Sequence, residues 1–340
     1  MQHKQWHDND SPFIAAHEQP AVIIDLASQR GIDVNRVLKG SRLFYEDVLQ
    51  GNACISINQF FHIIQNANHL IPGDDLSFRF GHLILPGNSS CYSTAFHNAP
   101  NLQAAIECLI DFSIKLTPLL RPRIILDDKY CYLHWLGAFA NREQKRFAIE
   151  ATYNALTSAS RWLSGQRLPW YYFFSDDQPS HQEQYDVHFG SRVKFNAHID
   201  MMRIERRHLT QAWPKSSQTS FQMAYSQGLQ EYAELDWQVG FIEYLYQFLW
   251  DNAQTAPSLE LVAEHLCMSP ATLKRRLKSH SISFQKIFDL VRKHLSMYLF
   301  SVKGFNNEEV AEYLRFHDVN NFRRSFKRWT GLTPSEFRQA

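Results

Sequence analysis

The chain has 340 residues, of which 44% are hydrophobic and 20% are charged, as is usual for a soluble globular protein. This length is too great for one ordinary core, so we expect two domains. No apolar run approaches the roughly 20 residues that a membrane-spanning helix needs, and the first ten residues, MQHKQWHDND, contain no apolar segment typical of a signal peptide. The five cysteines form no C-x-x-C pair, which favours a reduced, cytosolic location.

Several segments of the first 235 residues predict helices or strands, which indicates a mixed α/β domain. Apolar residues recur at helical spacing in four segments: 20–40, 56–73, 101–120 and 142–165. The segment 76–87 is short and ambiguous. The stretches RPRIILDD and KYCYLHWLG predict two strands, at residues 124–126 and 130–136, on either side of a turn. Further strand-like runs follow in LPWYYFFSDD and VHFGSRVKFNAHIDMMRI, and some of their aromatic rings are candidates for lining a small-molecule pocket.

The pattern changes after Trp213. DWQVGFIEYLYQFLWDN, residues 236–252, predicts an aromatic-rich helix that packs within the chain, and a polar stretch follows it up to residue 256. Beyond this connector we find only short helical segments and turns, so residues 257–340 are expected to form an all-α domain. The fold class of the whole chain is therefore α+β.

Charge also separates the C-terminal part from the rest. Residues 257–340 contain 14 Lys/Arg and 8 Asp/Glu, whereas residues 1–256 contain 21 and 26, and the net charge of the chain is only +1. The asymmetry favours a domain that binds a polyanion, although charge alone is explained equally well by a soluble basic surface.

The C-terminal part contains a weak internal duplication. VAEHL at residues 262–266 recurs as VAEYL at residues 310–314. Each copy is followed by a turn and a second helix, which reads SPATLKRRLKSH (269–280) in the first copy and DVNNFRRSFKRWTG (318–331) in the second. Ser269 and Asp318 are positioned to cap these second helices. Each copy thus has the layout of a helix-turn-helix.

The second helix of each copy combines an apolar side with a basic side. Leu273 and Leu277 in the first copy, and Phe322 and Phe326 in the second, are four residues apart and predict the buried side, to which Trp329 adds. A single basic amphipathic helix is more often a solvated surface. Two capped copies with matched cores favour recognition helices that enter the major groove of DNA.

The segment between the copies, residues 283–300, predicts a helix about 27 Å long. Recognition helices at its two ends would fit successive major grooves, which recur about every 34 Å along one side of B-DNA. Arginine reads guanine bidentately and asparagine reads adenine, so we expect base contacts from Arg323, Arg324, Asn320 and Asn321. Lys278 and Lys327 are expected to hold phosphates.

These residues carry a family resemblance. APSLELVAEHLCMSPATLKRRLKSHSISFQKIFDLVR and VAEYLRFHDVNNFRRSFKRWTGLTPSEFR closely resemble the AraC/XylS family of bacterial transcription regulators. Upstream, RGIDVNRVLKG, FGHLILPG, TAFHNAPNLQAAIECLIDF and VHFGSRVKFNA resemble the branch of that family with an arabinose-binding-like N-terminal domain. The resemblance covers most of the chain.

The resemblance implies an N-terminal effector-binding or dimerisation domain (1–235), a helix and connector (236–256), and a seven-helix DNA-binding domain with two helix-turn-helix motifs (257–340). The implied partners are double-stranded DNA, a small-molecule effector, a second copy of the chain and RNA polymerase. No association with a membrane is expected. Carried over by position, the residues that contact DNA are Ala271, Thr272, Lys274 and Arg275 in the first motif and Asn320, Asn321, Arg323 and Arg324 in the second.

Three positions bear on the turns and on the joining helix. Ser281 and Arg315 stand where the family usually has glycine, and each would cost about 1 kcal/mol if its backbone is left-handed. Arg292 is implied to have a structural role through ion pairs rather than a role in reading DNA.

No catalytic or metal-binding pattern accompanies these motifs. His181, His188, His198 and His208 lack the spacing of metal ligands, and the sequence has no P-loop, G-x-S-x-G or G-x-G-x-x-G. We therefore expect no enzyme activity, no cofactor and no metal. The alternative is a metabolite-binding protein or enzyme whose basic C-terminal domain anchors it to nucleic acid, and it predicts a catalytic polar cluster within residues 1–230.

Overall fold

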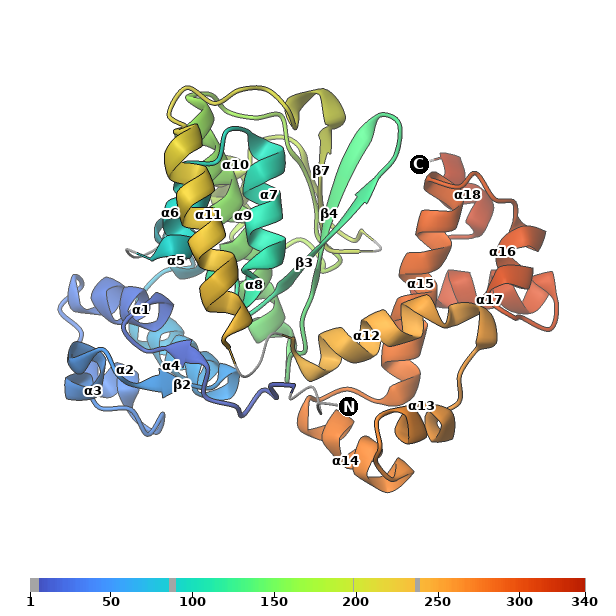
Figure 1. Ribbon diagram of the computed structural model, residues 1–340, viewed down its shortest axis with the longest axis horizontal. Helices are drawn as coiled ribbons and strands as arrows, with labels where there is room; N and C mark the ends of the chain where they lie inside the picture. The colour runs from blue at the N-terminus through green and yellow to red at the C-terminus, as the bar shows by residue number, and fades with distance from the viewer. Residues whose placement is uncertain (1–5, 86–89, 198, 236–238, 340) are drawn as a thin grey trace.

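The computed structural model describes residues 6–85, 90–197, 199–235 and 239–339. A larger N-terminal body contains all the strands of these residues, and a smaller helical part follows it (Figure 1). This arrangement confirms the α+β class. Two sets of residues named above lie outside the described residues. They are His198, one of the four histidines considered for a metal site, and residues 236–238, at the start of the predicted aromatic-rich helix.

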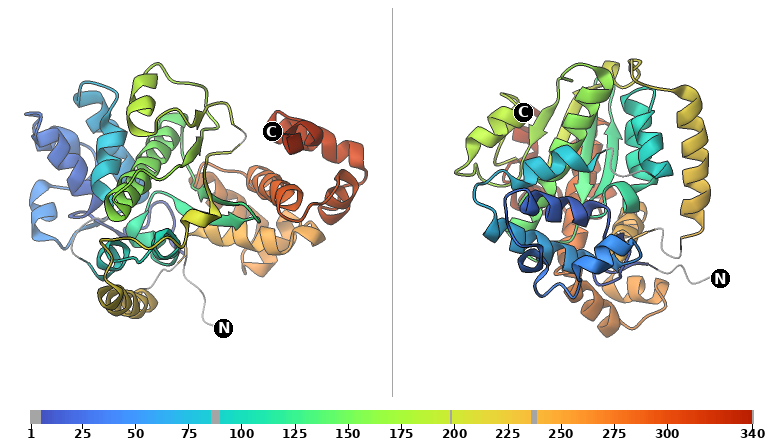
Figure 2. Two further views of the ribbon diagram at one scale, coloured as in Figure 1. Left: turned by 90° about the horizontal axis from the view of Figure 1, so that it is seen from above. Right: turned by 90° about the vertical axis from the view of Figure 1, so that its left-hand side faces the viewer.

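The N-terminal body is mostly helical. Its helices are α1 (Gln19–Ser28), α2 (Val34–Leu38), α3 (Tyr45–Gln50), α4 (Ile57–Leu70), α5 (Leu76–Ile84), α6 (Cys91–His97), α7 (Leu102–Asp111), α8 (Ser113–Leu116), α9 (Arg142–Ser164), α10 (Gln182–His188) and α11 (Gln218–Ala233), with a 3-10 turn at Arg206–His208. The four predicted helical segments all contain helices, and the ambiguous segment 76–87 contains α5. α11, which packs beside α6 on the outside of the body, was not predicted from the sequence (Figure 2).

A five-stranded sheet forms the centre of the body. Its strands are β3 (Arg121–Leu126), β4 (Tyr130–Leu136), β5 (Tyr171–Phe173), β6 (Val193–Lys194) and β7 (Met201–Glu205), in the order β3-β4-β7-β5-β6. All neighbours are antiparallel except β5 and β6, and a separate pair, β1 (Ile14–Ala15) and β2 (Cys54–Ile55), is also antiparallel. The predicted hairpin is confirmed, with Ile125 opposite Tyr132. β3 begins earlier than predicted, because an edge strand tolerates Pro122.

The two faces of the sheet have different neighbours. Cys131 and Leu133 of β4 point into the main core, which also contains buried residues of α7 and α9. His134 and Leu136 alternate with them, so they point to the other face. Leu136 belongs to a core shared with the C-terminal helices, so this second face carries the contact between the two parts of the chain.

Within described residues 239–339, the C-terminal part contains the α-helices α12 (Phe241–Asp251), α13 (Leu259–His265), α14 (Pro270–Ser279), α15 (Phe284–Ser301), α16 (Asn307–Tyr313), α17 (Val319–Thr330) and α18 (Pro334–Gln339). A 3-10 turn at Ala253–Thr255 separates α12 from α13. α12 lies within residues 236–252, where the sequence predicts an aromatic-rich helix, and its Phe241, Leu245 and Leu249 are buried in the core of this helical part. Among the described residues, no helix is long and apolar enough to cross a bilayer.

Candidate nucleic-acid interface

The first candidate recognition helix is α14. Ser269 accepts a hydrogen bond from the Thr272 amide at 3.1 Å, so the predicted cap is present, and Pro270 occupies the first turn. Leu273 and Leu277 are buried beneath it. The structure places the sequence-predicted contact residues on its remaining faces: Ala271, Lys274, Arg275 and Lys278 are exposed and Thr272 is half-buried.

The second candidate recognition helix is α17. Asp318 caps it by accepting a hydrogen bond from the Asn321 amide at 2.7 Å, and Gly331 ends it with a left-handed backbone. Phe322 and Phe326 are 0% exposed, and Trp329 is half-buried against Phe316, so the predicted aromatic anchor is confirmed. The outward residues of α17 are Asn320, Arg323, Arg324 and Lys327, all exposed, with Asn321 half-buried.

A short chain of polar contacts organises the first turn of α17. The Asn321 amide nitrogen donates to Asp318 at 2.6 Å, and Arg324 donates to the Asn321 amide oxygen at 2.6 Å. The side chain of Asn321 is therefore hydrogen-bonded to both Asp318 and Arg324. It can bind a base only when bonds to the base replace these two hydrogen bonds. Arg323 lies 3.6 Å from Glu308 in an exposed ion pair, which contributes little and yields readily to a phosphate or base.

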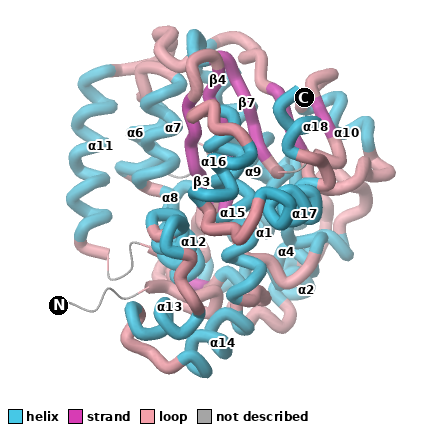
Figure 3. Tube along the Cα trace, turned by 90° about the vertical axis from the view of Figure 1, so that its right-hand side faces the viewer, coloured by secondary structure: helices cyan, strands magenta, loops and turns pink. Residues whose placement is uncertain are grey.

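α15 holds the two helix-turn-helix units at its two ends. Its Ile287 and Val291 belong to a core with Leu273 and Leu277 of α14, whereas Leu295 and Leu299 belong to a separate core with α16 and α17. Seen from the C-terminal side, α14 lies at the lower end of the domain and α17 higher up (Figure 3). The joining helix predicted for residues 283–300 is confirmed, with Ser283 as its cap.

Arg292 of α15 makes contacts within the protein, as the resemblance implies. These contacts are with aromatic rings and not with a carboxylate. Its guanidinium carbon lies 4.1 Å from the ring centre of Phe288 and 5.0 Å from that of Phe316. Phe288 belongs to the first core and Phe316 packs against the second. Arg292 therefore links the two units, and cation–π contact replaces the expected ion pair.

The turns adopt the strained backbone that the missing glycines suggested. Arg315 has φ 54° and Ser281 has φ 57°, and Cys267, 48 positions before Arg315, has φ 53°. Both helix-turn-helix turns therefore use a left-handed residue at the same point of the repeat. This geometry is retained without glycine, at a cost of about 1 kcal/mol per residue.

We expect Ser281→Gly to stabilise the C-terminal part by about 1 kcal/mol, because glycine adopts positive φ without strain. Ser281 is exposed, so no packing is lost. Urea unfolding of the full chain measures the gain. Ser279→Gly, at the last residue of α14, where the backbone is helical, is the matched control and should not stabilise the protein. Equal effects of the two substitutions would show that the Ser281 backbone is not strained.

The N-terminal segment docks against the first helix-turn-helix, which the sequence did not predict. Asp8 accepts two hydrogen bonds from Arg276 of α14, both at 2.9 Å, and one from His280 at 2.7 Å. Burial alone would raise the pKa of Asp8, but the hydrogen bonds from His280 and Arg276 outweigh it and lower the pKa to about 2. The guanidinium of Arg276 is therefore bound to Asp8, whereas the neighbouring Arg275 is exposed.

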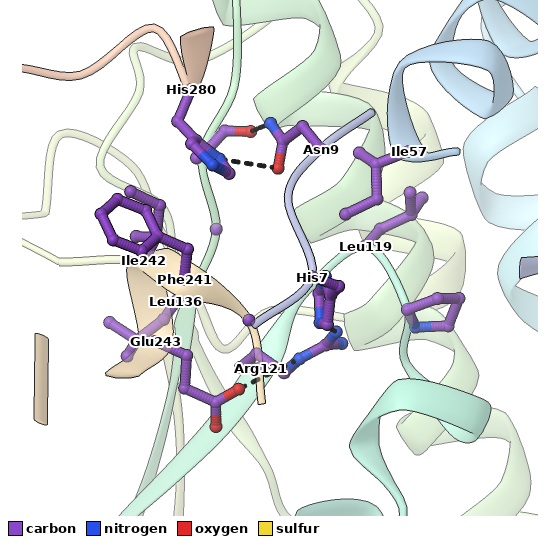
Figure 4. Close-up of a pocket in the computed structure, with 14 residues that line it drawn as sticks. His7, Asn9, Ile57, Leu119, Arg121, Leu136, Phe241, Ile242, Glu243 and His280 are labelled. Carbon is purple, nitrogen blue, oxygen red and sulfur yellow. Dashed lines mark hydrogen bonds and ion pairs between the residues drawn. The ribbon is translucent and has the colours of Figure 1, made fainter. Parts of the chain in front are cut away.

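A second set of contacts joins the same segment to the sheet. Figure 4 shows Arg121 between His7 and Glu243, with Asn9 beside His280, around a cavity of only about 50 Å3. Arg121 donates to His7 at 3.0 Å and lies 3.3 Å from Glu243 of α12. The cavity is too small for a ligand, so these residues connect the two parts of the chain.

Buried histidines also lie between the two parts. The ring centres of His134 on β4 and His294 on α15 are 5.0 Å apart, and the two rings are 3% exposed. Burial, aided by the charges of Arg123 and Lys293, lowers the pKa of His134 to about 3. Burial likewise lowers the pKa of His294, together with the charges of Lys293 and His134. Both rings are therefore neutral at pH 7.

We expect acidification from pH 7 to pH 5 to destabilise the protein through His134 by about 2 kcal/mol. The unfolded chain binds a proton at this histidine below pH 6.5, whereas the folded protein binds it only near pH 3, so stability falls as pH drops through this window. Urea unfolding at both pH values measures the effect. His134→Gln should remove this part of the loss, and exposed His69→Gln should not. An unchanged pH dependence in His134→Gln would contradict this explanation.

Comparison with known proteins identifies the family. Residues 31–212 match the family described as the arabinose-binding domain of AraC transcription regulator, N-terminal, and residues 262–340 match a helix-turn-helix domain family. The first match alone covers more than half of the chain. The chain belongs to the AraC family of transcription regulators. This family is not an enzyme family, and its helix-turn-helix domain implies binding to DNA.

The chain is also similar to individual transcription regulators. The chain is 25% identical to the ornithine utilization regulator of Pseudomonas aeruginosa, over 94% of each protein. It is 29% identical to the regulator GadX of Escherichia coli over 24% of this chain and 30% of that protein. The crystal structure of the transcriptional regulator CdpR from Pseudomonas aeruginosa aligns over 98% of this chain and 100% of that chain, with 17% identity and a TM-score of 0.45.

Proposed function

We propose that this AraC-family regulator binds its operator with α14 and α17 in two successive major grooves. The observation that carries the proposal is that α15 holds two capped helices, each with a buried apolar side and an exposed basic side. The proposed contacts are Ala271, Thr272, Lys274, Arg275 and Lys278 from α14, and Asn320, Asn321, Arg323, Arg324 and Lys327 from α17.

We further propose that the N-terminal body, residues 1–235, controls this binding in response to a small molecule. Support comes from the extensive contact between its sheet and the C-terminal helices, through Leu136, Arg121 and Arg123. An effector with different affinity for two arrangements of the parts would shift the population between them. A homodimer and contact with RNA polymerase are proposed from the family, and a cytoplasmic location follows from DNA as the partner.

Competition binding at fixed salt tests the proposed function. Operator fragments selected by the purified full chain from random DNA should bind about 10³-fold or more tightly than unrelated DNA. A ratio near one would show an architectural DNA binder, or a metabolite-binding protein that is anchored to nucleic acid by charge alone.

A further inference from the structure

A large cavity lies between the N-terminal sheet and the C-terminal helices. Its volume is about 560 Å3, within the range of about 300–1,000 Å3 typical of small-molecule sites. Strands β3, β4, β5, β6 and β7 contribute one wall, and α15 and α18 contribute the opposite wall. The strands face these two helices across this region in Figure 1. A ligand here would therefore touch both parts of the chain.

The charged side chains that line this cavity are all cationic. Lys194, Arg203 and Arg338 line it, and no Asp or Glu does so among the described residues. Within the same part of the chain, none of the three cations forms an ion pair with a carboxylate. The lining of the cavity therefore carries positive charge and no carboxylate, which favours an anionic ligand.

Arg203 is held in place by aromatic rings instead of a carboxylate. Its guanidinium carbon lies 4.5 Å from the ring centre of Tyr130, 4.9 Å from that of Tyr171 and 5.3 Å from that of Phe173. The carboxylate of nearby Asp127 accepts a hydrogen bond from Tyr132 at 2.6 Å. Ring contacts fix the position of Arg203 while leaving its donors available for a planar carboxylate.

His134 supplies an unpaired polar atom at the same cavity. Its side chain is 3% exposed, and its Nε2 has no hydrogen-bond partner in the described structure. Buried polar atoms in folded proteins almost always have a partner, but this atom has almost no accessible surface, so it is an unsatisfied group behind the cavity wall and not a contact of the proposed ligand.

The apolar side chains of the lining also come from both parts of the chain. Ile125 and Met201 contribute from the sheet, Met297 and Phe300 from α15, and Phe337 from α18. An apolar ligand body would bury against these side chains, while fully hydrophilic anions such as inorganic phosphate would leave them without contact.

We propose that this cavity binds an organic monocarboxylate with an apolar body, with the carboxylate at Arg203 and the body against the α15 side chains. This inference rests on the proposed effector control and names the ligand class and site. Because the walls belong to both parts, the ligand stabilises the arrangement in which α15 faces the sheet and raises the thermal stability of the whole chain.

Decanoate and 3-phenylpropionate are suitable probes, with 3-phenylpropanol and 3-phenylpropylamine as neutral and cationic analogues of the same body. Calorimetric titration and melting of the full chain should show saturable binding and a rising Tm for at least one carboxylate. The alcohol and the amine should bind at least tenfold more weakly, because they lack the charge that Arg203 recognises.

Two variants from opposite walls locate the binding. Arg203→Met on the sheet and Arg338→Met on α18 should each weaken carboxylate binding about tenfold or more. Lys215→Met is the matched control, since Lys215 lies over the Trp162 ring and outside this cavity. It should leave the affinity unchanged. Arg338 is exposed, so its variant remains informative even if Arg203→Met folds poorly.

The proposal is overturned if neither carboxylate binds saturably, or if both arginine variants bind as the wild type does. Operator binding by the same samples separates this result from the proposed function. Specific DNA binding with no carboxylate binding would remove only the ligand inference, whereas loss of specific DNA binding would remove the proposed function itself.

Discussion

Phe326→Ala is expected to destabilise the second helix-turn-helix by about 3–5 kcal/mol and to abolish high-affinity operator binding. Phe326 is 0% exposed and contacts the rings of Phe300, Phe322 and Phe337 in the core beneath α17. Truncation to alanine leaves a cavity in a core of few residues, and α17 loses the side that holds it to α15. Its basic side chains then no longer keep a fixed geometry.

Hydrogen exchange of the full chain measures this local effect, because the two helix-turn-helix cores are separate. Amides of α16 and α17 should lose protection in Phe326→Ala, whereas those of α13 and α14 should retain it. Leu277→Ala is the matched variant in the first core, and it should give the reverse pattern. Uniform loss across both units in either variant would show that they unfold together.

Arg324→Ala is expected to relax the base preference at one operator position, at a cost of about 1–3 kcal/mol on the preferred sequence. Arg324 is exposed on α17 and is held by Asn321, which is fixed in turn by the capping Asp318. These hydrogen bonds hold the guanidinium at the N-terminal half of α17. In helix-turn-helix proteins, this half of the recognition helix contacts the base edges. Loss on non-preferred sequences should be small.

Lys327→Ala is the matched control for Arg324→Ala, since Lys327 is exposed one turn further along the same helix. It should weaken binding to all sequences alike and reduce the salt slope by about one. Binding of operator variants across a salt series distinguishes the two residues. Equal loss on every sequence from Arg324→Ala would refute its role as a base reader.

The C-terminal elements were the most predictable from sequence, because their signals are local and doubled. Ser269 and Asp318 cap the helices that they were expected to cap, and Leu273 and Phe322 lie on the buried side that their spacing indicated. Both signals depend only on residues a few positions apart in the chain, so they can be found directly in the sequence.

The N-terminal body was less predictable where packing uses small residues. α11 fully buries only Ala224 and Gly228, and the aromatic residues on the same side, Phe221, Tyr225 and Tyr232, are only partly buried against the core. A Cβ added at Gly228 would lie 2.9 Å from the Phe112 ring, so close approach of the helix explains the absence of a large side chain. The contact side of α11 mixes small and aromatic residues, so the amphipathic pattern of this helix is weak.

Contacts between the two parts of the chain were not predictable. Asp8 and Arg276 are 268 positions apart, and neither has a local pattern that indicates its partner. The same holds for Arg203, whose aromatic support comes from two other strands, and for His134 opposite His294. Such sites arise from the way the sheet and α15 meet, a tertiary arrangement that a single sequence does not encode locally.

Protection of guanine N7 from methylation by the purified full chain on its selected operator tests the central claim most directly, because N7 lies in the major groove. Two protected segments, about one helical turn apart on one side of the duplex, are predicted, with Arg275→Ala weakening only one and Arg324→Ala only the other. A single protected segment, or loss of the same guanines in both variants, would contradict the binding of α14 and α17 in successive grooves.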